Sequence, residues 1–360
     1  MTMETLKTFL IFPFVVAAIV SYLATPVVIK WARKLGIMDD PIGKTHPKII
    51  HTTITPRGGG IAIFAGLFVA SLIFLPTDKT LLGILAGAFV LTVVGFLDDK
   101  YDLNPYLRLF LGFFAASLPI AAGIGIAFVT NPFGGIIDLS QPQIAFNLFG
   151  STHTIWLLSD LFALFWVTFL MNVVNMGAKG VDGQLTGVTV ISALTIAALS
   201  LKFSADIAQW PVIILAGITA GAFSGFLPWH IFPQKIMPGY GGSTLAGYLL
   251  AVLSILATAK VGILVVVLGV PLIDTGYTIL RRIASGKSPV WGDTGHLHHR
   301  LLDLGFTKSQ VAVFYWSVTA VLGILALNLN TTLKIYTMVG IAVLLGGLLI
   351  WLTYRPKKAQ

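Results

Sequence analysis

Three aspartates that follow an apolar stretch are spaced for shared chemistry. Asp102 follows Asp98 by four residues and Asp99 by three, and residues at these separations share one face of a helix. Acidic side chains at a helix C-terminus oppose the helix dipole at a cost of roughly 0.3–1 kcal/mol each, and like charges repel. A divalent cation would relieve both penalties, and carboxylate oxygens suit Mg2+. The run therefore predicts metal or acid–base chemistry, with solvated acids on a turn before Asn104-Pro105 as the alternative.

A second polar stretch, residues 172–184, follows a later apolar run. Asn172 and Asn175 lie on one helix face, and their amides offer both donors and acceptors. A glycine-rich loop follows and presents Lys179 and Asp182. These side chains could bind a polar substrate. Asparagines also hold transmembrane helices together, so a structural role for the amides stays open.

A third polar region precedes the second apolar run. Residues 39–46 form a polar loop in which Lys44 is a candidate phosphate contact, and Arg57 is followed by three glycines. Glycines that open a helix leave free N–H groups that can hold phosphate. Glycine also favours close helix packing in a membrane. Taken alone, this motif favours packing.

Histidines cluster near the C-terminal end of the chain. Three of the seven histidines, His296, His298 and His299, fall within four residues and are followed by Arg300. A zinc site is one interpretation, but no cysteine or glutamate is near and the spacing matches no common zinc pattern. An anion-binding patch fits the neighbouring arginines better.

The composition sets the class of protein that must position these side chains. Of 360 residues, 56% are hydrophobic, 10% are charged and none is cysteine. Soluble domains carry about 25% charged residues, so a soluble globular protein is excluded. The absence of cysteine excludes thiolate catalysis, iron–sulfur clusters and cysteine-based zinc sites. We expect a single integral-membrane domain over residues 1–360.

Apolar runs predict an all-α polytopic membrane protein, because about 20 apolar residues span the hydrocarbon core. We predict about 11 transmembrane helices, with approximate ranges 8–29, 59–76, 81–97, 107–130, 155–176, 185–200, 208–229, 242–258, 261–280, 310–328 and 335–353. Between the fourth and fifth runs, residues 131–154 contain two short strand-like stretches around Gln141-Pro142. They predict a small hairpin on the outer surface.

The basic residues predict the orientation in the membrane. Eighteen of the 23 lysines and arginines fall in one set of loops and five in the other. Because cytoplasmic loops carry the excess of basic residues, we expect the N-terminus outside and the C-terminus in the cytoplasm. The net charge of +9 is then explained by topology, and nucleic-acid binding is unnecessary. Most of the polar candidates fall in the cytoplasmic loops.

Taken in order, these motifs resemble those of the polyprenyl-phosphate N-acetylhexosamine-1-phosphate transferase family. The resemblance covers nearly the whole chain: the Asp-x-Pro…Lys-x-His element, the Gly-Gly opening of the second run, the pair Asp98-Asp99, the Asn-x-x-Asn…Asp-Gly loop, Pro271-Leu272-Ile273-Asp274-Thr275 and His296-Leu297-His298-His299-Arg300. Each element is weak alone, but their joint order is specific. The form of the histidine motif is similar to the GlcNAc branch of the family rather than the muramoyl-pentapeptide branch.

The resemblance implies transfer of a sugar-1-phosphate, GlcNAc-1-phosphate in this branch, from a UDP-sugar to undecaprenyl or another polyprenyl phosphate. The reaction would occur at the cytoplasmic face of the cell membrane, release UMP and use Mg2+, with Mn2+ as an alternative. By this resemblance Asp98 and Asp99 would act on the lipid phosphate and hold the metal, and Asp182 is the third catalytic candidate. The implied substrate-binding residues are Lys44, Asn172, Asn175, Lys179, His296, His298, His299 and Arg300.

Two positions depart from the family pattern. Lys179 and Tyr240 stand where the family carries acids, and the second of those acids is assigned to magnesium. We expect weaker magnesium binding, or a lysine that supplies part of the metal's charge, since a tyrosine offers no anionic ligand at neutral pH.

Two other classes remain as alternatives to an active transferase. One is a catalytically silent relative that binds lipid phosphate or nucleotide sugar as a regulatory or scaffold subunit. The other is a secondary transporter, which is disfavoured because transport sites lie near the bilayer midplane. The expected partners are a UDP-sugar, a polyprenyl phosphate and the bilayer, with a homodimer as one further assembly.

Overall fold

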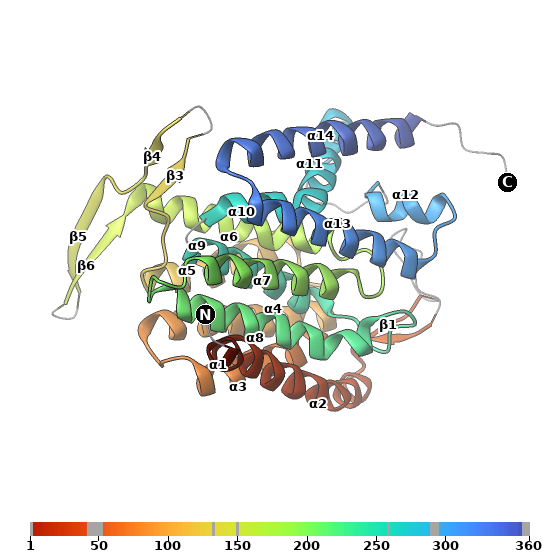
Figure 1. Cartoon of the computed structure of the whole chain (residues 1–360). Coiled ribbons are helices and arrows are strands. Elements are labelled where there is room, and N and C mark those ends of the chain that lie inside the picture. The colour runs from red at the N-terminus through yellow and green to blue at the C-terminus, as the bar shows by residue number, and fades with distance from the viewer. Residues whose placement is uncertain are drawn as a thin grey trace.

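The protein is a bundle of apolar helices with a small β-rich arm at one end (Figure 1). The computed structural model describes residues 3–41, 53–131, 134–148, 151–257, 260–288 and 295–354, so Lys44 lies outside the described residues. The helices are α1 (Met3–Leu6), the π-helical η1 (Lys7–Ile11), α2 (Phe12–Lys34), α3 (Gly59–Phe74), α4 (Lys79–Tyr101), α5 (Pro105–Ala121), α6 (Leu157–Gly177), α7 (Gln184–Lys202), α8 (Gln209–His230), α9 (Gly239–Leu256), α10 (Lys260–Val267), α11 (Gly269–Ala284), α12 (Leu297–Asp303), α13 (Lys308–Asn328) and α14 (Thr331–Tyr354).

The helix lengths confirm an all-α polytopic membrane protein. Among the described residues, eight helices are long and apolar enough to cross a membrane, and the bent pair α10–α11 makes a ninth candidate. Two shorter apolar helices, α3 and α5, have 16 and 17 residues. Each of the eleven apolar runs contains a helix, whereas the number that cross the bilayer stays a prediction.

The fourth apolar run is a shorter helix than the sequence suggests. We expected an apolar segment over residues 107–130, but α5 ends at Ala121 and residues Phe128–Thr130 form a strand. Gly123 adopts a φ of +105°, Gly123 N–H donates to Ile120, and Ile124 N–H donates to Pro119. This pair of hydrogen bonds is the Schellman end of a helix, which a glycine permits.

The ninth run, expected over residues 261–280, is broken. α10 and α11 meet at an angle of 79° around Leu268. Pro271 lies in the first turn of α11, where its missing N–H group interrupts no hydrogen bond within that helix. A continuous helix through Leu268 would require that donor, so the chain changes direction here.

Short antiparallel strands form three two-stranded sheets: β1 (Met38–Asp39) with β2 (Thr55–Pro56), β3 (Phe128–Thr130) with β4 (Ile136–Asp138), and β5 (Gln143–Leu148) with β6 (Ser151–Trp156). The expected strands on either side of Gln141-Pro142 are confirmed as β4 and β5, but the single hairpin is wrong: β4 pairs with β3 and β5 pairs with β6. β3–β6 form the arm on the left of Figure 1, at the opposite end of the bundle from β1 and α12. Their location outside the cell stays a prediction.

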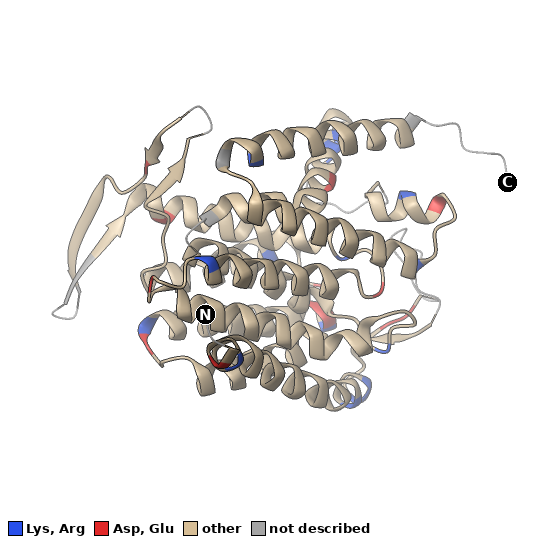
Figure 2. Ribbon diagram, in the orientation of Figure 1, with Lys and Arg blue, Asp and Glu red and all other residues tan. Residues whose placement is uncertain are grey.

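Helix α9 lies at the centre of the bundle and α14 at its periphery. The apolar stretch of α9 is 94% buried and that of α14 only 6%. A Cβ atom on Gly95 of α4 would collide with the backbone of Gly241 in α9, so these helices touch at the level of the polar motifs. Figure 2 shows that charged residues gather at the ends of the bundle, with uncharged helix between them.

Candidate functional site

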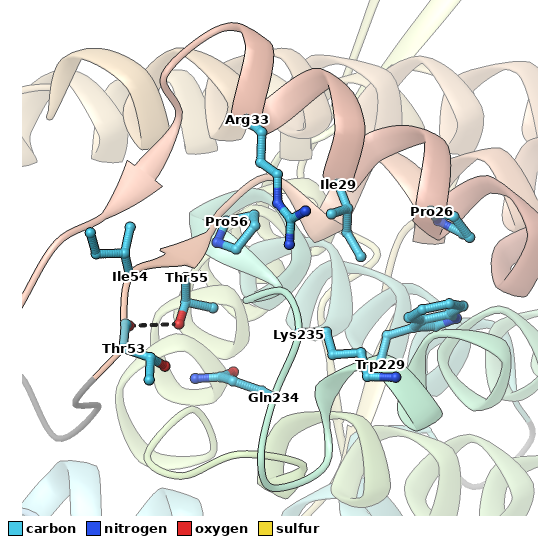
Figure 3. Close-up of a pocket in the computed structure, with 10 residues that line it drawn as sticks. All are labelled: Pro26, Ile29, Arg33, Thr53, Ile54, Thr55, Pro56, Trp229, Gln234 and Lys235. Carbon is cyan, nitrogen blue, oxygen red and sulfur yellow. Dashed lines mark hydrogen bonds between the residues drawn. The ribbon is translucent and has the colours of Figure 1, made fainter.

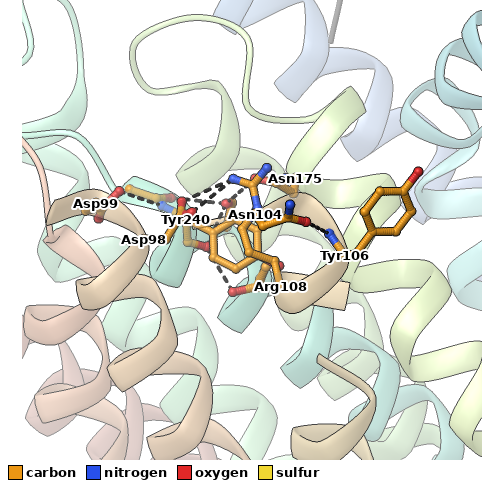
Figure 4. A network of polar contacts seen from close by, with 10 residues as sticks. Asp98, Asp99, Asn104, Tyr106, Arg108, Asn175 and Tyr240 are labelled. Carbon is orange, nitrogen blue, oxygen red and sulfur yellow. Dashed lines mark hydrogen bonds and ion pairs between the residues drawn. The ribbon is translucent and has the colours of Figure 1, made fainter. Parts of the chain in front are cut away.

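The α4–α5 hairpin brings a cation back to the first aspartate. Asp102 ends α4 in the left-handed conformation, with a φ of +51°, and Asn104 caps α5 by accepting a hydrogen bond from Tyr106 N–H. The tight turn returns Arg108 to α4, where its Nη1 lies 3.1 Å from Oδ1 of the buried Asp98. The first acid of the pair is thus charge-paired inside the fold (Figure 4).

The second aspartate faces the start of α9. Oδ1 of buried Asp99 accepts a 3.1 Å hydrogen bond from the backbone N–H of Tyr240. A helix N-terminus carries partial positive charge and suits an anion. The Tyr240 ring lies beneath the Arg108 guanidinium, 5.1 Å from the ring centroid, a cation–π arrangement. Tyr240 therefore links the two acids as a neutral neighbour.

Two further cations lie near the aspartate pair. Arg57 forms an ion pair with Asp39 at 2.8 Å, which joins the two strands β1 and β2. Burial lowers the pKa of Lys179 from 10.5 to about 8, while the nearby Asp99 carboxylate opposes that change and Arg57 adds to it. Lys179 and Arg57 are thus electrostatically coupled to the acids. With Arg108, three cations lie near Asp98 and Asp99, and Arg57 is also paired with Asp39.

Gln184 shapes the loop that carries Lys179. Its buried side-chain oxygen accepts hydrogen bonds from Gly180 N–H and Val181 N–H, each at 3.1 Å, and its amide nitrogen donates to Gly177 at 3.2 Å. One side chain therefore bridges the end of α6 and the start of α7. Gln184 follows Asp182-Gly183 directly, but its residue type and spacing alone did not indicate this role.

Asp182 lies at the end of this loop and is buried. Its Oδ2 accepts a 3.3 Å hydrogen bond from Gln234 N–H, and its Oδ1 lies 3.7 Å from Lys308 Nζ at the start of α13. Asp182 therefore ties the 177–184 loop to the segment that precedes α9. The segment that contains Gln234 leads into α9, and it therefore connects Asp182 to Tyr240.

The two asparagines of α6 have different surroundings. Asn175 Oδ1 accepts a 2.6 Å hydrogen bond from Ser243 Oγ of α9, whereas Asn172 Nδ2 donates to Thr168 O within its own helix. Asn175 belongs to the network drawn in Figure 4. The contact with Ser243 agrees with the structural alternative for that amide, and binding roles for both stay predictions.

The histidine motif begins with a buried histidine–carboxylate pair. His296 Nδ1 lies 2.8 Å from Asp274 Oδ2, and Leu297 N–H donates to Asp274 Oδ1 at 2.7 Å. Because the carboxylate engages Nδ1, it fixes the ring orientation and leaves Nε2 to make other contacts. Asp274 thus positions both the ring and the start of α12, a role that spacing alone did not indicate.

The remaining residues of the motif serve packing as well. Burial lowers the pKa of His298 well below 6.5, and a Cβ atom on Gly180 would collide with its ring. The His299 ring contacts the His298 ring at an interplanar angle of 44°, with centroids 4.3 Å apart. Arg300 donates to Gly295 O, Leu349 O and Thr353 Oγ1, so these donors anchor α12 to α14. The expected anion contacts stay predictions.

The candidate residues thus gather in two connected groups, one around Asp98 and Asp99 and one around the 177–184 loop and α12. Three residues that were not among the predicted candidates belong to these groups: Arg108 to the first, and Asp274 and Gln184 to the second. Arg108 could have been suspected because it lies one helical turn after Asn104-Pro105, a pair that marks the start of a helix.

The aspartate pair suits a hard cation that is shared with a substrate. Asp99 Oδ2 is buried and has no hydrogen-bond partner among the described residues. Mg2+ is usually held by one or two carboxylates together with substrate phosphates. Across the part of the chain that the structure describes, no group of three or more His, Asp or Glu side chains could hold a metal. A metal here would therefore depend on two protein carboxylates.

The chain is similar to known transferases over most of its length. Residues 81–258 match the family described as Glycosyl transferase family 4. A Bacillus subtilis (strain 168) protein named probable undecaprenyl-phosphate N-acetylglucosaminyl 1-phosphate transferase is 32% identical over 313 residues, which cover 84% of this chain and 80% of that protein. The decaprenyl-phosphate N-acetylglucosaminephosphotransferase of Mycobacterium leprae (strain TN) is 27% identical over 368 residues, covering 93% and 86%. The undecaprenyl-phosphate alpha-N-acetylglucosaminyl 1-phosphate transferase of Yersinia pestis is 27% identical over 342 residues, covering 90% and 84%.

Proposed function

Because the chain belongs to glycosyl transferase family 4, we propose that it transfers N-acetylglucosamine-1-phosphate from UDP-N-acetylglucosamine to a polyprenyl phosphate. The observation that carries this proposal is the gathering of Asp98, Asp99, Arg57, Arg108 and Lys179 at one end of a membrane-spanning bundle. The names of the relatives support the acceptor and the sugar.

In the proposed reaction, an oxygen of the acceptor phosphate attacks the phosphorus attached to the sugar. The bond from that phosphorus to the bridging oxygen breaks, and UMP leaves with the bond's electron pair. A new diphosphate then joins the sugar to the lipid. Because phosphoryl transfer depends mainly on positioning and charge stabilisation, the protein's main task is to bind the diphosphate and orient the acceptor.

Three cations supply charge for that task. Arg57, Arg108 and Lys179 surround the acids, and each can donate hydrogen bonds to phosphate oxygens. Arg108 is held in place by Asp98 and by the Tyr240 ring. Lys179, with a pKa lowered by burial to about 8, is protonated at neutral pH.

The aspartates complete the site. Asp99 Oδ2 is buried and has no hydrogen-bond partner among the described residues, and we assign it the proton of the acceptor phosphate. Asp98 orients Arg108. Asp98 and Asp99 would also hold Mg2+, with Mn2+ as the alternative; a bound dication would neutralise charge on the diphosphate and the leaving UMP.

The proposal includes the orientation and assembly of the protein. The 18-to-5 distribution of basic residues supports a site on the cytoplasmic side of the cell membrane. The polyprenyl chain would then enter from the bilayer between helices. A homodimer stays a prediction, which the mass of the detergent-solubilised protein tests.

The decisive experiment supplies purified full-length protein with UDP-N-acetylglucosamine, undecaprenyl phosphate and Mg2+. We expect equal amounts of UMP and lipid-linked sugar diphosphate. UDP-glucose and dodecyl phosphate, in place of the sugar donor and the lipid, serve as controls for specificity. Binding of donor or lipid without any UMP release over a range of Mg2+ and Mn2+ concentrations would contradict the proposal and favour the silent-relative alternative.

A further inference from the structure

A cavity of about 340 Å3 lies on the other side of the segment that precedes α9. It opens between the C-terminal part of α2, strand β2 and residues 229–235 (Figure 3). Ligand pockets in proteins usually measure about 300–1,000 Å3, so the cavity can hold a small polar group. None of the residues assigned to the transferase reaction lines it.

Two cations face each other across this cavity. Arg33 reaches in from α2, and Lys235 comes from the opposite wall beside Gln234 (Figure 3). Within the described residues, neither side chain has a carboxylate within 4 Å. Lys235 Nζ instead lies over the Trp229 ring, 5.2 Å from its centroid. The cavity therefore presents two cations that no described acid neutralises.

Polar and apolar groups are separated along the cavity. Thr55, Gln234 and the two cations provide the polar part, while Ile29 and Trp229 provide apolar surface. The lining thus suits a ligand with an anionic oxygen-rich head and an apolar body.

The position of the cavity matches the boundary of a membrane. Arg33 is the penultimate residue of the candidate span Met3–Lys34, and Trp229 is the penultimate residue of the span Gln209–His230. Helix ends, basic side chains and tryptophan mark the level of the lipid headgroups. This placement holds for either orientation of the protein. A ligand here can keep its acyl chains in the bilayer.

We propose that this cavity is a binding site for the phosphate headgroup of an anionic phospholipid, formed by Arg33 and Lys235 beside the Trp229 ring. The site is distinct from the proposed transferase site but shares a wall with it. Pro56 lines the cavity, and its carbonyl accepts a 2.8 Å hydrogen bond from Met237 N–H, three residues before Tyr240.

The test measures lipid binding to the full chain in a mild detergent by native mass spectrometry. The probes are dioleoyl-phosphatidylglycerol, dioleoyl-phosphatidylcholine and inorganic phosphate. We compare the native protein with Arg33→Ala/Lys235→Ala and with Lys30→Ala/Lys34→Ala. The control pair removes two cations from the same end of α2 that do not line the cavity. It therefore matches the loss of charge while leaving the proposed site intact.

We expect the native protein and the control to retain phosphatidylglycerol in preference to phosphatidylcholine. A cation near an anionic lipid contributes roughly a fivefold gain in affinity, so the pocket variant should bind phosphatidylglycerol about 25-fold more weakly. The control variant should lose less than about threefold, since its cations lie outside the cavity and contacts between exposed charges contribute little. Arg33 and Lys235 are exposed, so the variant should fold, and Lys235→Gln alone provides a milder second measurement.

Two results would overturn the proposal. Equal losses in the pocket and control variants would mean that lipid attraction is a general property of the basic surface. The native protein could instead bind inorganic phosphate to the same extent as phosphatidylglycerol at equal concentration. That result would mean that the cavity selects free phosphate rather than a lipid. Neither result depends on whether the protein releases UMP, so failure here leaves the proposed transferase function untouched.

Discussion

Arg108 Nη1 lies 3.1 Å from Asp98 Oδ1, although the two residues belong to different helices. The turn between α4 and α5 reverses the chain and brings the guanidinium to a carboxylate that is 6% exposed. A buried carboxylate without such a partner would be costly. Asp98 therefore cannot be treated as a free metal ligand, since any dication would share it with Arg108.

Arg108→Gln should weaken donor binding and strengthen metal binding together. Loss of one charge-assisted hydrogen bond should raise the KM for UDP-N-acetylglucosamine about tenfold. Without the competing guanidinium, the Mg2+ concentration for half-maximal rate should fall. UMP release measured at varied donor and Mg2+ concentrations gives both values. Lys100→Gln, at an exposed position in the last turn of α4, is the control. If neither the KM nor the Mg2+ requirement changes in Arg108→Gln, this role is refuted.

Asp99→Asn should abolish most turnover while preserving the fold. The substitution keeps the side-chain volume but deletes the charge that we assign to proton transfer and metal binding, a loss of roughly 10²–10³-fold in kcat. The matched control is Asp102→Asn, because Asp102 is exposed in the left-handed conformation that asparagine tolerates. Near-native turnover by Asp99→Asn would favour an aspartate with a structural role alone.

The pH profile should report Lys179. Burial lowers its pKa from 10.5 to about 8, so the side chain is a cation below pH 8 and loses its proton as the pH rises beyond that value. If the ammonium binds the diphosphate, kcat/KM should decline above about pH 8, because this ratio reports groups of the free enzyme. Lys179→Arg should keep its charge and move the decline to higher pH. Identical alkaline limbs in the two proteins would rule out Lys179 as the titrating group.

Asp274→Asn should destabilise the C-terminal part of the bundle. Asp274 is 1% exposed and accepts hydrogen bonds that position His296 and Leu297 N–H. Weakening these charge-assisted contacts should cost about 1–3 kcal/mol of stability, measured as a lower thermal unfolding midpoint in detergent. Asp303→Asn, at the exposed end of α12, should leave the midpoint unchanged. Equal midpoints for both variants would show that the Asp274–His296 pair contributes nothing to stability.

Membrane orientation can be measured with single cysteines, since the chain has none of its own. Ser288→Cys should resist an impermeant thiol reagent added to intact cells, because the distribution of basic residues predicts a cytoplasmic location for this loop. Thr154→Cys, in strand β6 at the other end of the bundle, should react. Labelling of Ser288→Cys in intact cells, with Thr154→Cys protected, would reverse the orientation.

The composition and the apolar runs were sufficient to predict helices, because a membrane span must satisfy its own backbone hydrogen bonds and be apolar over its length. Both requirements are properties of a local stretch of chain. Local signals also predicted Asp98-Asp99, the Asn-x-x-Asn motif and the histidine cluster as candidates. They overestimated the length of the helix after Pro105, where Gly123 ends α5 early.

The pairing of these residues was decided by tertiary packing. Gly95 and Gly241 are far apart in the chain, yet their helices touch, and only that contact brings Asp99 to the N–H of Tyr240. The turn after Asp102 returns Arg108 to Asp98, and the start of α12 lies beside α11, where His296 meets Asp274. Residue types and spacing therefore determined which chemistry the chain can carry. The crossing of the helices decided which acid pairs with which cation. Two helices can approach closely only where the shapes of both surfaces fit, and that fit leaves no periodic signal in the sequence of either helix.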